Sequence, residues 1–73
     1  MKYPYSVLIQ WSDEDQMYLV TLPEFAEIAM QPSTHGRTYE EAVKNAQEAI
    51  AGYLAYCEEA GLAAPTPNML QVA

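Results

Sequence analysis

The sequence has very few of the residues that build metal sites, disulfides or phosphate-binding surfaces. Its 73 residues include one cysteine, Cys57, and one histidine, His35. A single cysteine excludes an internal disulfide, and a structural zinc site needs several such ligands. Three lysines and arginines stand against ten aspartates and glutamates, a net charge of −7. Because nucleic-acid surfaces rest on basic clusters, we expect no direct nucleic-acid binding, and we expect no cofactor.

Long hydrophobic runs are also missing. No apolar stretch approaches the length of a transmembrane helix, and Met1–Tyr5 lacks the apolar run of a signal peptide. We therefore expect a cytoplasmic protein with no membrane contact, folded as a single domain over residues 1–73. A chain this short buries only about 60% of its unfolded surface, so we expect a homo-oligomer or a stabilising partner.

Alternating residues at the start of the chain predict a β-hairpin. From Tyr3 to Trp11, one side carries aromatic and β-branched residues, which is typical of a strand. Ser12–Gln16 is a polar turn, and Met17–Leu22 alternates again as a second strand that Pro23 ends.

The segment from Glu24 to Gly36 has two readings. Ala26, Ile28 and Met30 alternate with polar or small residues, which favours a third strand over residues 26–31. A helical turn beginning at Pro23 is the alternative. Residues 31–36 are a loop by composition, and residues 69–73 are expected to form a short C-terminal strand.

A long amphipathic helix follows. Thr38 and Glu41 form a capping box in which the threonine hydroxyl accepts from the Glu41 N–H and the Glu41 side chain reaches back to Thr38. Gly61 is the expected C-terminal cap. The predicted fold is α+β, an antiparallel three-stranded sheet with one long helix packed on it. The apolar side of the helix is predicted to comprise Tyr39, Ala42, Val43, Ala46, Ala49, Ile50, Tyr53, Leu54, Cys57 and Ala60.

No group of residues has the pattern of an active site, so we do not expect an enzyme. Asp13–Asp15 lacks the spacing of a calcium loop, and His35 has no activated nucleophile beside it. Cys57 falls on the apolar side of the helix, where a thiol is inert. Most tyrosines, with Trp11, are assigned to the core. Tyr18 and Tyr56 lie less clearly inside and are candidates for contact with a partner.

The order of several short motifs resembles the HicB family, the antitoxins of bacterial HicA–HicB pairs. The residues that carry the resemblance are Tyr3-Pro4, Leu22-Pro23-Glu24, the run Gly36-Arg37-Thr38-Tyr39-Glu40-Glu41-Ala42-Val43, and Pro65-Thr66-Pro67. Within them, the signature positions that we expect to be structural are Pro23, Gly36, Thr38, Glu41 and Ala42.

The resemblance implies a β-β-β-α-β domain with a partial ribonuclease H-like fold. It also implies a non-catalytic module that neutralises HicA, a small basic toxin that cleaves mRNA. Contact is expected through the acidic sheet edge and helix, and the residues proposed to take part are Tyr18, Glu24, Glu27, His35 and Tyr56.

The chain departs from the family pattern in three respects. Phe25-Ala26-Glu27-Ile28 stands where members commonly have Gly-Cys, and the span from Pro23 to Gly36 is longer than usual. Full antitoxins often add a C-terminal DNA-binding domain, which this sequence does not show before Ala73. The resemblance is therefore not extended to DNA binding.

Two other functions remain open. One is an orphan homo-oligomeric or adaptor domain without a toxin. The other is a divergent metal-dependent nuclease, which would need several carboxylates, Asp13 and Glu24 among them, to converge on metal ions. Most carboxylates fall on the outer side of the helix or in the hairpin turn, which disfavours a nuclease.

Overall fold

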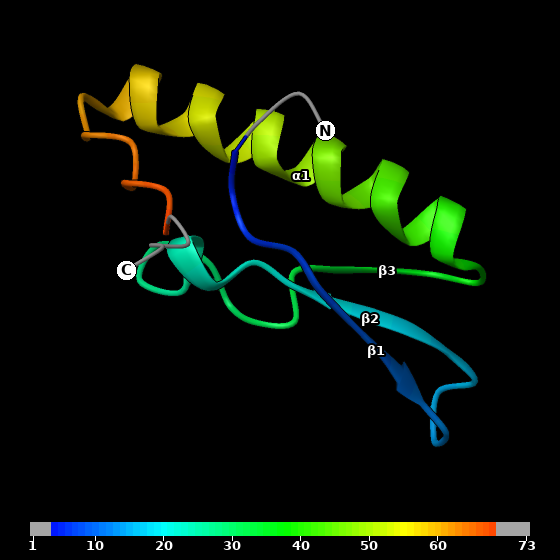
Figure 1. Cartoon of the computed structure of the whole chain (residues 1–73). Coiled ribbons are helices and arrows are strands. Elements are labelled where there is room, and N and C mark those ends of the chain that lie inside the picture. The colour runs from blue at the N-terminus through cyan, green and yellow to red at the C-terminus, as the bar shows by residue number, and fades with distance from the viewer. Residues whose placement is uncertain (1–3, 69–73) are drawn as a thin grey trace, which may run out of the picture.

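The computed structural model describes residues 4–68 and shows an antiparallel sheet crossed by one long helix (Figure 1). Its strands in spatial order are β1 (Leu8–Ser12), β2 (Met17–Thr21) and β3 (Thr34–Gly36). This confirms the predicted α+β class, whereas the ribonuclease H-like likeness stays a prediction and the strand predicted over residues 69–73 lies outside the described residues. In chain order the elements are β1 (Leu8–Ser12), β2 (Met17–Thr21), the 3₁₀ helix η1 (Pro23–Phe25), β3 (Thr34–Gly36) and α1 (Tyr39–Ala60).

The hairpin of β1 and β2 is shorter than predicted. Its register runs from Leu8 opposite Thr21 to Ser12 opposite Met17. The prediction of a strand from Tyr3 was wrong for residues 4–7, because Pro23 turns the chain away and leaves them no partner strand. The Ser6 N–H instead donates to the carboxylate of Glu24, at 3.0 Å from Oε2.

The third strand lies later than predicted. The interpretation of residues 26–31 as a strand was wrong, and the alternative of a helical turn at Pro23 describes η1. The pairing with β2 involves Thr34–Gly36, which the composition had assigned to a loop. Figure 1 shows the chain after η1 looping round before it enters β3.

Local hydrogen bonds explain why this segment does not extend. The proline at the start of η1 has the φ angle of a helical turn, and the N–H groups of Phe25 and Ala26 donate to Leu22 and Pro23. The turn buries Phe25 completely and leaves Met30 90% exposed. Leu22 directly follows the last residue of β2, and its N–H donates to Gln31 Oε1 at 3.0 Å. That N–H therefore does not pair with a neighbouring strand.

Helix α1 begins and ends largely as its caps predict. The Thr38 hydroxyl accepts from the Glu41 N–H at 3.1 Å. The prediction that the Glu41 side chain reaches back to Thr38 was wrong. The Glu41 carboxylate accepts from the Arg37 N–H instead, at 3.0 Å. At the other end, Gly61 has a left-handed backbone (φ 71°). Its N–H and that of Leu62 donate to carbonyls of the last turn, which is a Schellman motif.

The core lies between α1 and the sheet. Helix α1 packs mainly on β3 and β2, and β1 forms the far edge. The predicted apolar side of the helix is confirmed except at Tyr39 and Ala60, which are exposed because they lie at its two ends. The buried residues come from β2, η1 and α1: Val20, Leu22, Phe25, Ala42, Ala46, Ile50 and Cys57.

Candidate protein-binding surface

Three aromatic rings form a row at the end of the molecule where α1 begins. The rings of Trp11 and Tyr18 meet edge to face at 5.0 Å between centroids, and those of Tyr18 and Tyr39 stack at 4.4 Å. We call this set, Trp11, Tyr18 and Tyr39, the aromatic row. It joins β1, β2 and α1, so its members are distant in sequence but share one surface.

The aromatic row is partly open to solvent. Trp11 is 49% exposed and Tyr39 59%, while Tyr18 between them is half-buried. The sequence assigned Trp11 and Tyr39 to the core, and the structure contradicts this. Tyr39 is the first residue of α1 and Trp11 lies on the edge strand near its end, so no further turn of helix covers either ring.

Acidic residues follow two members of the aromatic row closely in sequence. Asp13, Glu14 and Asp15 are exposed in the hairpin turn that follows β1, and Glu40 and Glu41 are exposed in the first turn of α1. The turn is fixed internally, since the Ser12 hydroxyl donates to Asp15 Oδ2 at 3.0 Å and accepts from the Asp15 N–H. The two segments that carry the exposed rings are therefore rich in negative charge. Both exposed rings stand close in sequence to these acidic runs, which is a signal that sequence reasoning missed.

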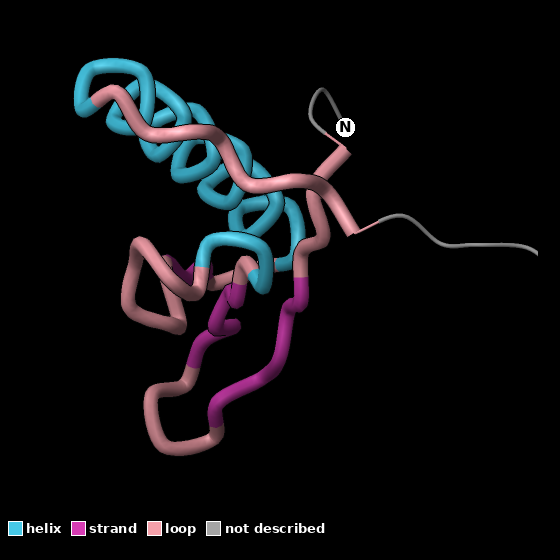
Figure 2. The backbone as a smooth tube through the Cα atoms, turned by 90° about the vertical axis from the view of Figure 1, so that its left-hand side faces the viewer, coloured by secondary structure: helices cyan, strands magenta, loops and turns pink. Residues whose placement is uncertain are grey.

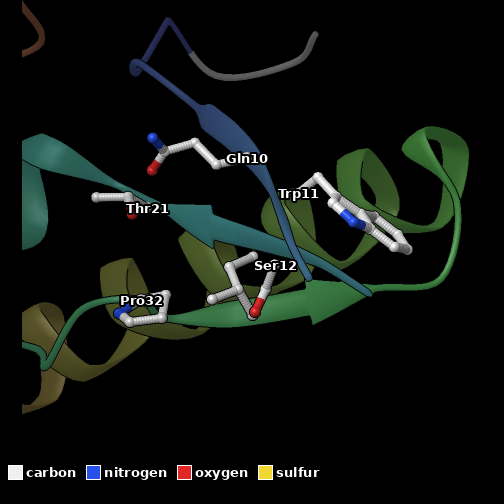
Figure 3. Close-up of a pocket in the computed structure, with 6 residues that line it drawn as sticks. Gln10, Trp11, Ser12, Thr21 and Pro32 are labelled. Carbon is white, nitrogen blue, oxygen red and sulfur yellow. The ribbon is translucent and has the colours of Figure 1, made fainter. Parts of the chain in front are cut away.

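The face of the sheet turned away from α1 carries a shallow hollow of about 290 Å³ (Figure 3). Its described lining residues are uncharged and divide equally between polar and apolar side chains. His35, opposite Leu19 in the register, lies on the same face. None of the described residues that line the hollow is charged, so they include no candidate general acid or base. The lining residues are Gln10, Trp11, Ser12, Leu19, Thr21 and Pro32.

Glu24, a predicted contact residue, is used inside the fold. Its carboxylate accepts from the Ser6 N–H, from the Ser6 hydroxyl at 3.1 Å and from the Asn68 N–H at 2.9 Å. Burial raises the pKa of Glu24, but the hydrogen bonds from Asn68 and Ser6 outweigh this, so the pKa lies below its ordinary value. Glu24 thus ties the segment before β1 to the segment after α1, and it is poorly placed to bind a partner.

The other predicted contact residues are exposed but scattered. Glu27 lies in the turn after η1, and Tyr56 is 53% exposed near the end of α1. Tyr56 follows Tyr39 by 17 positions, which is about 25 Å along the helix. The structure therefore brings Tyr18 together with Trp11 and Tyr39, and it does not bring Glu27, His35 and Tyr56 to the same place.

Within residues 4–68, no three side chains of histidine, cysteine, aspartate or glutamate gather where they could hold a metal ion. In the same range no helix is long and apolar enough to cross a membrane.

A protein-family model described as the HicB-like antitoxin of bacterial toxin–antitoxin systems matches residues 5–73. The chain belongs to the HicB-like antitoxin family. No curated protein and no solved structure matches it.

In this HicB-like chain, four of the five signature residues lie at the junction between sheet and helix. Gly36 ends β3 directly against the first turn of α1, where a side-chain carbon would lie 2.7 Å from the Cα of Ala42. Thr38 and Glu41 cap the helix, and Pro23 begins η1. The contacts that these residues make are therefore those of the fold itself.

Proposed function

We propose that this HicB-like chain is the antitoxin of a toxin–antitoxin pair and neutralises a small, basic, RNA-cleaving toxin in the cytoplasm. Its family membership is the observation that carries the proposal. The chain acts without catalysis, by binding the toxin and covering the surface that the toxin needs for RNA.

Charge supports this mode of action. An enzyme that cleaves RNA must present a cationic surface to the phosphates of its substrate. The chain carries a net charge of −7, and its acidic residues include the exposed hairpin turn and the first turn of α1. Complementary charge speeds the encounter of two proteins and favours the correct partner. The acidic surface can thus compete with RNA for the toxin.

Co-purification tests the proposal. The chain is expressed with the protein encoded beside it, and that protein carries the affinity tag. We expect a small basic neighbour that retains the chain through gel filtration and that stops growth when expressed alone. A neighbour with the same tag but a catalytically inactive sequence provides the control, because it separates binding from growth arrest. A neighbour that is not basic, or that elutes without the chain, would argue against an antitoxin.

We also propose that the chain self-associates, because the sheet leaves an apolar side chain exposed opposite the helix. Leu8 on β1 is 47% exposed and faces away from Ile9, which packs against the core. Light scattering over a range of concentrations measures the mass. We expect a mass above that of one chain, reduced by Leu8→Lys. A monomer at all concentrations would contradict self-association without touching the antitoxin proposal.

A further inference from the structure

We propose that the aromatic row, Trp11, Tyr18 and Tyr39, is the receptor for an arginine side chain of the basic partner. This rests on the proposed function, which supplies a basic protein partner, and it assigns the surface that holds that partner. The guanidinium group stacks on the exposed ring of Trp11 or Tyr39 while the neighbouring carboxylates accept its N–H groups.

The geometry of the rings supports the assignment. Trp11 and Tyr39 each expose about half of their surface, and both contact the half-buried Tyr18 between them. Contacts at 5.0 and 4.4 Å fix the outer rings against the central one, so little ring motion is lost when a ligand binds. A cation over a tryptophan or tyrosine face is attracted by the negative face of the ring.

The charges nearby favour a cation over an anion. The hairpin turn begins two positions after Trp11, and residues 13–15 are all acidic. Glu40 and Glu41 immediately follow Tyr39, and their negative charges offset the positive end of the α1 dipole. Glu41 is held in place by the Arg37 N–H. Arg37 precedes the helix and Lys44 lies one turn beyond Glu40, so two basic residues stand against the five carboxylates of these two segments and the local charge remains negative.

Arginine fits this surface better than lysine or a nucleic-acid base. A guanidinium group is planar, stacks on aromatic faces and presents its donors sideways to carboxylates, whereas an ammonium group is a compact, strongly hydrated charge. Exposed aromatic rings also stack bases in proteins that bind single strands, but those proteins surround the rings with basic grooves. Here carboxylates follow Trp11 and Tyr39 closely in sequence, and carboxylates repel a phosphate backbone.

Titration with defined peptides tests the receptor directly. Trp11 is the single tryptophan, so its fluorescence reports on the aromatic row without a label. An arginine–glycine peptide at low salt is expected to change the emission of Trp11 and to bind at least about threefold more tightly than a lysine–glycine peptide of equal charge. Equal affinity for the two peptides would overturn stacking, and so would a uridine oligonucleotide that binds more tightly than either.

Variants locate the peptide on the protein, with affinities measured by calorimetry. Trp11→Leu and Tyr39→Leu keep an apolar side chain but remove the ring, and each is expected to weaken the arginine peptide about five- to tenfold. Leu62→Ala is the matched control, because Leu62 is exposed to nearly the same extent as Trp11 but lies beyond the far end of α1. Tyr56→Leu controls for the loss of an exposed tyrosine elsewhere. Wild-type affinity in both ring variants, or equal losses in the controls, would overturn the proposal. Circular dichroism confirms that each variant is folded.

The same variants separate this inference from the proposed function. If the tagged basic neighbour binds the wild-type chain and binds Trp11→Leu and Tyr39→Leu equally well, the surface is wrongly assigned while the antitoxin function stands. If the neighbour binds none of the proteins but the arginine peptide behaves as expected, the antitoxin function fails and the aromatic row remains a receptor for arginine.

Discussion

Gly36 at the end of β3 lies against Ala42 in the first turn of α1, at a distance that leaves no room for a side chain. A carbon added at Gly36 would lie 2.7 Å from the Cα of Ala42 and overlap its backbone nitrogen. The close approach is possible because both residues are small, and Ala42 and Ala46 are completely buried where the helix meets the sheet. Figure 2 shows the helix passing over one side of the strands in this arrangement.

Gly36→Ala is expected to destabilise the protein by about 2–3 kcal/mol, because backbone atoms of α1 have to move to admit the new carbon. Urea unfolding followed by circular dichroism measures the loss. A variant with wild-type stability would show that the junction of β3 and α1 is looser than the structure indicates.

Gly52→Ala provides the opposite case. Gly52 lies inside α1, and a side-chain carbon there would meet no described atom within 4 Å apart from its chain neighbours and the adjacent backbone of the helix itself. We expect the alanine to stabilise the protein by up to about 1 kcal/mol, since glycine is a poor helix former. The same urea measurement applies. A loss of stability would indicate that another chain approaches the helix at Gly52.

Thr38→Ala is expected to cost about 1 kcal/mol, because the hydroxyl that accepts the Glu41 N–H is removed from the start of α1. Thr38→Ser is the matched control, since it retains that acceptor and should remain near wild-type stability. Thermal unfolding of both variants side by side separates the effect of the cap from that of the side chain. Equal losses in the two would assign the cost to the missing methyl group.

Low pH is expected to weaken the hydrogen bonds by which Glu24 links Ser6 to Asn68. The pKa of Glu24 is lowered in the folded chain from an unfolded value of 4.5, so its ionised form stabilises the fold above that value. This contribution is lost as the pH falls below 4.5 and through the folded pKa. Protonation removes charge from the carboxylate that accepts from three donors, the Ser6 N–H, the Ser6 hydroxyl and the Asn68 N–H.

Urea midpoints measured from neutral pH down to acid test this dependence. Glu24→Gln should lose stability at neutral pH and show a flatter pH profile than the wild type. Glu27→Gln is the control, because Glu27 is an exposed glutamate of the neighbouring turn. If the profile of Glu24→Gln runs parallel to that of the wild type, the carboxylate does not make the contribution described.

The parts of the fold that depend on local chemistry were predictable from the sequence. Alternation located the hairpin, and Thr38 and Gly61 located the ends of α1, because caps and strand periodicity are properties of neighbouring residues. The third strand was not predictable in this way. Its position depends on the Gln31 side chain taking the Leu22 N–H and on the burial of Phe25, and both are long-range or side-chain effects.

The candidate surface was only partly predictable. Tyr18 was proposed as a contact residue because it lay less clearly inside and tyrosine is enriched at interfaces. Its neighbours Trp11 and Tyr39 were assigned to the core by periodicity. Periodicity tells which side a residue faces but not where the covering element stops, and both rings lie where α1 begins. Glu24 differs in the opposite way. It was predicted to contact a partner, but its carboxylate accepts hydrogen bonds within the fold.

Inhibition of RNA cleavage tests the central claim, that the chain neutralises a basic toxin, most directly. The purified neighbouring protein is incubated with a messenger RNA, and the chain is added in increasing amounts. We predict that cleavage falls in proportion to the chain added and stops near equal molar amounts, and that the chain alone cleaves nothing with or without magnesium. Cleavage that continues at a large excess of the chain would contradict the account.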